Sequence, residues 1–114
     1  ERSAFEREAV RIEAATCAAL CEAARMASYA IVTRRAAGET IGSETSSARY
    51  ATVMAERRVA EFVAEFLPEA LVDAQPYLKM HHQRGIVAGI AAGAAEIQLN
   101  IVADQVLGLP REPR

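Results

Sequence analysis

Apolar residues recur at intervals of three and four along the first third of the chain, which is the spacing of an amphipathic α-helix. From about Ser3 to about Arg35 this spacing continues without a break. Strand-forming residues are sparse, and Ala is the commonest residue. We therefore predict an all-α chain. Its first helix is long and carries one apolar stripe, made of Phe5, Ala9, Ile12, Thr16, Ala19, Ala23, Ala27 and Ile31. Because Ala lets neighbours approach closely, we expect this helix to be packed on more than one side.

The end of the first helix and the start of a second are marked by two glycines followed by Ser and Thr, within Ala36–Thr45. Ser and Thr are good N-caps, so the second helix should begin near Ser43 or Thr45. It should end near Leu67, because Pro68 disfavours a helical conformation in the residue before it. Pro68 can itself open a short turn. The predicted apolar face of the second helix comprises Ala48, Ala51, Ala55, Val59, Phe62, Val63 and Phe66.

The segment Gln75–Ala92 is broken by Pro76 at its start and contains Gly85 and Gly89 near its end. For it we predict a short helix around Tyr77–His82, followed by extended or irregular chain. A last helix should run from Gly93, as its N-cap, to Leu107. Gly108 and Pro110 form a standard stop signal after it. The apolar face of this helix comprises Ile97, Ile101, Val102, Val106 and Leu107.

Length and charge limit the function classes. The 114 residues, 52% of them hydrophobic, suffice for one domain, which we expect to span 1–114. The formal charge of −2, with both signs interspersed, offers no basic stripe for nucleic acid and no polybasic segment for a membrane surface. No apolar run is long enough to span a bilayer. Cys17 and Cys21 lie four residues apart, where a disulfide would be strained, so we expect a reducing compartment and a cytoplasmic protein.

Three small constellations could carry chemistry. Cys17 and Cys21 could supply two metal ligands, but no second pair follows, so we interpret them as small core residues. His81 and His82 point about 100° apart on a helix and cannot grip one metal together, so a solvent-facing or interface pair is expected. Two arginine doublets could meet phosphates, although solvated faces or ion pairs between subunits are commoner; they are Arg34-Arg35 and Arg57-Arg58.

The last third of the chain reads GAAEIQLNIVADQVLGLPRE from Gly93 to Glu112. It resembles the C-terminal signature of acyl-CoA dehydrogenases, commonly G-T-S-E-I-Q-x-N-I-I-A-x-x-V-L-G-L-P-R-E. Upstream, Arg25-Met26-Ala27-Ser28-Tyr29 and Ser46-Ser47-Ala48-Arg49 are similar, more weakly, to helices of the same family. The resemblance implies an up-and-down helical bundle that forms the C-terminal domain of a longer acyl-CoA dehydrogenase-like chain.

The resemblance also implies a function. Family members use FAD, held at a subunit interface, to dehydrogenate an acyl-CoA thioester at its α and β carbons, in the β-oxidation of fatty acids or steroid side chains. They work as homo- or hetero-tetramers, and electron-transfer flavoprotein is the expected electron acceptor. In many members the catalytic base is a Glu directly before the Gly of the signature. That position is Ala92 here, and a methyl group cannot take a proton. The base therefore lies elsewhere, outside this chain, or is absent from this subunit.

Other positions that correspond to the family's flavin contacts are altered as well. The cofactor-binding candidates are Gly93 and Ala94, where the usual Thr hydroxyl is lost, together with Glu96, Glu65 and Pro68. The last two stand where the family has Q-x-x-G-G, and Glu69 adds further negative charge near a pyrophosphate. The R-D motif before the signature is represented at best by Arg84. We expect a degenerate subunit of a heteromeric acyl-CoA dehydrogenase; the alternative is a non-catalytic helical assembly subunit that kept the fold and lost flavin chemistry.

Overall fold

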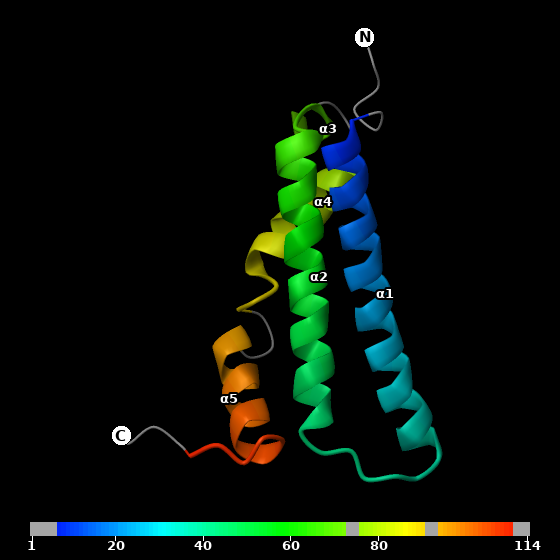
Figure 1. Ribbon diagram of the computed structural model, residues 1–114, viewed down its shortest axis with the longest axis vertical. Helices are drawn as coiled ribbons and strands as arrows, with labels where there is room; N and C mark the ends of the chain where they lie inside the picture. The colour runs from blue at the N-terminus through cyan, green and yellow to red at the C-terminus, as the bar shows by residue number, and fades with distance from the viewer. Residues whose placement is uncertain (1–6, 73–75, 91–93, 111–114) are drawn as a thin grey trace.

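The computed structural model describes residues 7–72, 76–90 and 94–110, and the description below concerns these residues (Figure 1). They form five helices and, over these ranges, no strand, so the predicted all-α fold is confirmed. The two long helices run antiparallel and side by side, and the later, shorter helices follow α2. The helices are α1 (Glu8–Ala36), α2 (Glu44–Phe66), α3 (Glu69–Val72), α4 (Pro76–Val87) and α5 (Ala95–Gln105).

Helix α1 packs on α2 through residues seven apart. Val10, Cys17 and Ala24 are its buried residues. A seven-residue repeat keeps one narrow seam of a helix facing its partner. The predicted stripe is wrong over the first part of the helix, where Ile12 is 57% exposed, but its later members Ala27 and Ile31 are half-buried. Phe5 lies outside the described residues. Both stripes have helical spacing, so periodicity alone did not distinguish the face that meets α2 from the one left open.

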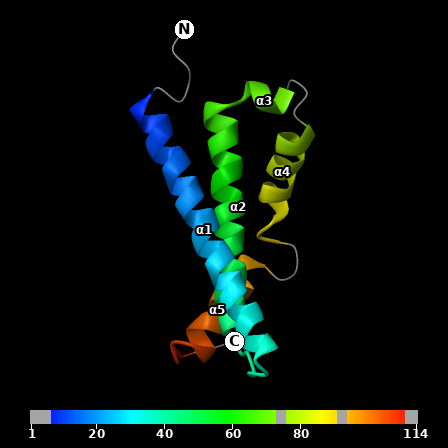
Figure 2. The same ribbon diagram turned by 90° about the vertical axis from the view of Figure 1, so that its right-hand side faces the viewer.

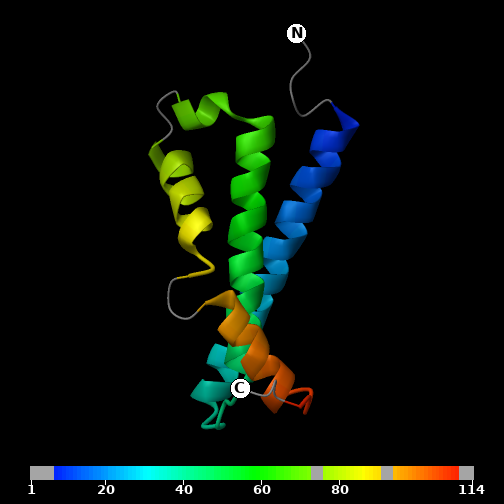
Figure 3. The ribbon, with the colours of Figure 1, turned by 90° about the vertical axis from the view of Figure 1, so that its left-hand side faces the viewer.

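Helix α2 is the centre of the fold, because it packs against α1, α3, α4 and α5. Figures 2 and 3 show α1 and α4 on different sides of it. Every residue of its predicted apolar face is buried or half-buried, as expected. Val53, which the prediction did not include, lies in the middle of the helix and is only 1% exposed. Phe62 and Phe66 stack near its C-terminal end with ring centroids 5.3 Å apart.

The connection between α1 and α2 follows the sequence prediction. Gly38 has a positive φ of 80°, a conformation that suits glycine, and its N–H donates to the carbonyl of Arg35. Arg34 reaches across the turn: its Nε lies 2.7 Å from a Glu39 carboxylate oxygen and its Nη1 lies 3.3 Å from one of Glu44. These contacts fix the loop against the start of α2.

Helix α4 is longer than predicted. It continues through Gly85 to Val87, whereas the sequence prediction ended it near His82 and left the rest extended or irregular. The reason is packing. A Cβ at Gly85 would lie 2.7 Å from the Ala60 Cβ and 3.0 Å from the Glu56 carbonyl oxygen of α2. Gly85 therefore permits close approach of two helices and does not end one.

Helix α5 begins at Ala95 with Ala94 as its N-cap, so the predicted N-cap at Gly93 is corrected; Gly93 itself and Ala92 lie outside the described residues. The Ala95 N–H donates to the Gly89 carbonyl at 2.8 Å. The helix ends before Gly108, whose φ is 64°, as the stop signal predicted. None of the helices in the described ranges is long and apolar enough to cross a membrane.

Candidate functional site

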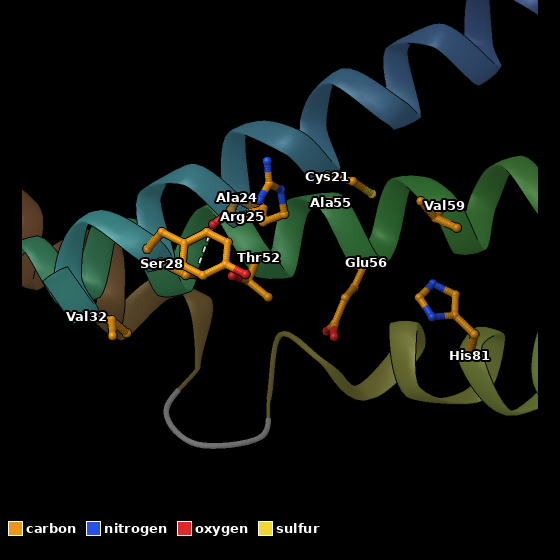
Figure 4. A pocket seen from close by; sticks show the side chains of 11 residues that line it. Cys21, Ala24, Arg25, Ser28, Val32, Thr52, Ala55, Glu56, Val59 and His81 are labelled. Carbon is orange, nitrogen blue, oxygen red and sulfur yellow. Dashed lines mark hydrogen bonds between the residues drawn. The ribbon is translucent and has the colours of Figure 1, made fainter.

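A groove of about 430 Å³ lies between α1 and α2, and one residue of α4 also lines it (Figure 4). Its walls are mainly apolar or small side chains at regular helical intervals. The sequence prediction missed it, although the signal was present as i, i+4, i+7 spacing on both long helices. It is lined by Cys21, Ala24, Arg25, Ser28, Tyr29 and Val32 of α1, by Thr52, Ala55, Glu56 and Val59 of α2, and by His81 of α4.

Two charged side chains stand at the groove. The Arg25 guanidinium is paired within α1, with its Nε 2.8 Å from a Glu22 carboxylate oxygen, and lies 5.2 Å from the centre of the Tyr29 ring. This pairing with Glu22 raises the pKa of Arg25 and lowers that of Glu22. The Glu56 carboxylate, 24% exposed, has a longer contact, 3.8 Å from Nη2 of Arg84. Glu56 thus places a weakly paired negative charge in an apolar wall.

The two cysteines differ in exposure. Cys17 is buried at the α1–α2 seam with its Sγ 3.7 Å from the Arg58 carbonyl oxygen, as predicted for a core residue. Burial raises the pKa of this thiol. Cys21 is exposed and lines the groove, which corrects its assignment to the core. Both thiols are free, and the described residues contain no cluster of three or more potential metal ligands.

The two histidines are not solvent-facing. Both are half-buried where α4 packs on α2, so of the two predicted alternatives the solvent-facing one is wrong. His82 Nδ1 lies 3.2 Å from the Ala60 carbonyl oxygen. The Nε2 atom of His81 is buried without a hydrogen-bond partner, at the end of the groove where α4 meets α2.

The arginine doublets make ion pairs within the chain. Arg58 joins the two long helices through Glu13 of α1 and also pairs with Glu61. The charge of Glu13 is the main cause that raises the pKa of Arg58. The exposed Arg57 lays its guanidinium over Gly89, where a Cβ would lie 2.9 Å from Nη2. Arg34 makes ion pairs at the α1–α2 turn. One residue of each doublet is therefore engaged in ion pairs within the chain, and its guanidinium is not left free for a phosphate.

Two of the predicted cofactor-binding residues, Ala94 and Glu96, lie at the start of α5. Ala94 has no side-chain hydroxyl, and the Ala95 N–H is already used by Gly89. Glu96 is exposed in the first turn, where a carboxylate favours the helix N-terminus. At this helix start, therefore, Ala94 offers no side-chain donor and the Ala95 N–H is not free to bind an anion.

At the end of α2, Glu65 and Pro68 are both exposed. Pro68 has no N–H, while the amides of Ala70 and Leu71 donate to the carbonyls of Leu67 and Pro68. Within one chain these groups lie far from the start of α5. The start of α5 is held by Gly89, which accepts the Ala95 N–H and packs beside Arg57 of α2. Glu65 lies two helical turns beyond Arg57, roughly 12 Å along α2. The structure does not bring the two sets of predicted cofactor residues together.

The described residues thus form an all-α bundle in which every other helix packs on α2 and an apolar groove lies beside it. The family model for "Acyl-CoA dehydrogenase, C-terminal domain" matches residues 1–107. The chain belongs to this family. Neither a search of curated proteins nor a search of solved structures found a significant match.

Proposed function

We propose that this chain is the C-terminal bundle of an acyl-CoA dehydrogenase-like protein that acts in α,β-dehydrogenation of an acyl-CoA thioester by supporting assembly. It would form subunit interface and a wall beside the FAD, and it would not supply the catalytic base. The observation that carries this proposal is the family match over nearly the whole chain. Ala92 stands at the position where many members have the catalytic base, and for this reason we propose a supporting role and not a catalytic one.

The described residues do not fit close binding of FAD by this chain alone. The N–H of Ala95 and those of Ala70 and Leu71 are satisfied internally, and Pro68 offers none. Glu65 and Glu69 would place negative charge beside a pyrophosphate, which would repel it. A competent partner subunit would then supply the principal flavin contacts and the base, in a heterotetramer of soluble subunits that passes electrons to electron-transfer flavoprotein.

The test is the visible absorbance spectrum of the full-length protein, purified alone and with the co-expressed product of its neighbouring gene. We expect flavin bands in the complex and none in the protein alone. Stoichiometric flavin and acyl-CoA turnover by the protein alone would overturn the proposal. As a matched pair of variants, Ala94→Thr restores the hydroxyl at the start of α5, and Ala103→Thr adds one further along the same helix. Any gain in flavin retention should occur in the first variant alone.

A second function is favoured by the same internally satisfied amides. The chain would be a non-catalytic assembly subunit that kept the fold after losing flavin chemistry. Flavin in neither preparation, together with a stable complex in gel filtration, would select this function.

A further inference from the structure

The connection that follows α4 has few apolar side chains with which to hold itself on α2. Among its described residues, Ala88, 5% exposed, and Gly89 are buried, whereas Ile90 is 72% exposed. Burial of one methyl group and of bare backbone removes little apolar area from water, so its hydrophobic stabilisation is small. Contacts of another kind must therefore keep Ala88 and Gly89 in place.

Helix α5, which the connection leads into, is also attached by few buried side chains. Ala95 is its one buried residue, and the side chains of Ile97 and Leu99 are 54% and 43% exposed. Its start is fixed by a backbone hydrogen bond, in which the Ala95 N–H donates to the Gly89 carbonyl at 2.8 Å. The position of α5 on α2 therefore depends on how firmly Gly89 is held.

Two arginines of α2 converge on the start of this connection. Arg49 donates from Nη2 to the Ala88 carbonyl at 3.0 Å. Arg57 lays its guanidinium over Gly89, where a Cβ would lie 2.9 Å from Nη2 and 3.1 Å from Cζ. The two arginines are about 12 Å apart along α2, yet they contact adjacent residues, so their side chains reach toward each other. Guanidinium groups stay charged at every ordinary pH, and the charge strengthens a bond to a carbonyl.

We infer that Arg49 and Arg57 form a clamp that positions α5 on α2, and that without the clamp α5 opens as a separate unit while α1 and α2 stay folded. Regions with few buried apolar contacts open locally at a lower free energy than the core does. Arg49 and Arg57 are thus positioning residues, which act on α5 through Ala88 and Gly89. The inference goes beyond the proposed function and does not depend on FAD or on a partner subunit.

The test is hydrogen–deuterium exchange of the purified full-length protein, measured by mass spectrometry on peptides from α5 and from the middle of α2. Arg49→Met keeps the apolar stem of the side chain and removes its donors. We expect exchange in α5 to become about tenfold faster, because a hydrogen bond from a charged group is lost. Exchange around Val53 should stay unchanged. Equal acceleration in the two peptides, or none in α5, would overturn the inference.

Three further variants separate the clamp from a general disturbance of α2. Arg49→Lys retains a charged donor, so exchange in α5 should rise by no more than about threefold; a rise as large as that of Arg49→Met would contradict the role of the donor. Arg57→Met uncovers Gly89 and should accelerate α5 by about threefold. The matched control is Arg58→Met, which removes the ion pairs with Glu13 and Glu61 and should leave α5 unchanged. Acceleration of α5 by Arg58→Met as large as that by Arg49→Met would also overturn the inference.

Discussion

Replacing Gly85 with Ala tests the close approach of α4 to α2. The new Cβ would lie 2.7 Å from the Ala60 Cβ, where carbon atoms prefer about 3.5–4.0 Å, so α4 must move away by roughly 1 Å. Ala improves helix propensity over Gly by about 1 kcal/mol. Overpacking a tight contact costs about 1–3 kcal/mol, so the net loss should be about 1 kcal/mol. We expect the urea midpoint, followed by helical circular dichroism, to fall by about 0.5 M for a urea m-value of about 2 kcal/mol/M.

The control for Gly85→Ala is Gly42→Ala, whose Cβ would meet only the movable Glu44 carboxylate, at 3.3 Å. It should change stability by less than about 0.5 kcal/mol. Combining Gly85→Ala with Ala60→Gly removes the clashing methyl, so the pair should show a favourable coupling energy of about 1 kcal/mol. Gly85→Ala that is neutral or stabilising, with no coupling to position 60, would refute the packing argument.

Three further outcomes follow from burial and charge. Val53→Ala should lower the free energy of unfolding by about 2 kcal/mol, since the side chain is 1% exposed, whereas Val72→Ala, at 83% exposed, should have no measurable effect in urea unfolding. Burial raises the pKa of Cys17, so above about pH 8.5 the folded state keeps a proton that the unfolded state releases. The free energy of unfolding should therefore decline above that pH. When unfolding midpoints are compared between pH 7 and 10, the decline should be smaller in Cys17→Ala. The pKa of Glu44 is lowered by its own backbone N–H and by Arg34, so its contribution to stability is present above about pH 4.3 and is lost on further acidification. Glu44→Gln should therefore flatten the acid limb of the plot of unfolding midpoint against pH. An unchanged acid limb would contradict this.

The sequence predicted the helices that local signals define. The glycine turn at Gly38, the stop at Pro68 and the stop at Gly108 all lie where φ preferences and missing donors place them. These signals act over a few neighbouring residues, so they can be recognised without tertiary structure. The family resemblance to the C-terminal signature was equally local and is confirmed by the family match.

Tertiary choices could not be predicted in the same way. Helix α1 has more than one apolar stripe because it is rich in Ala, and the face that meets α2 depends on α2 itself. From the sequence, Gly85 was expected to interrupt the helix. Its role is to let α4 lie close to Ala60 of α2, and no local sequence pattern contains that distance. His82 turned inward for the same reason. Of the candidate cofactor residues, Glu65, Pro68, Ala94 and Glu96 were located, at separated positions, and their role toward FAD stays a prediction.

The central position of α2 has a consequence for coupling within the bundle. Among the described helices, α1 and α5 each make their main contacts with α2. The groove lies along one stretch of α2, and the start of α5 is held through Gly89 beside Arg57 of the same helix. A sliding of α2 along its axis by a fraction of a turn would therefore shift both places together.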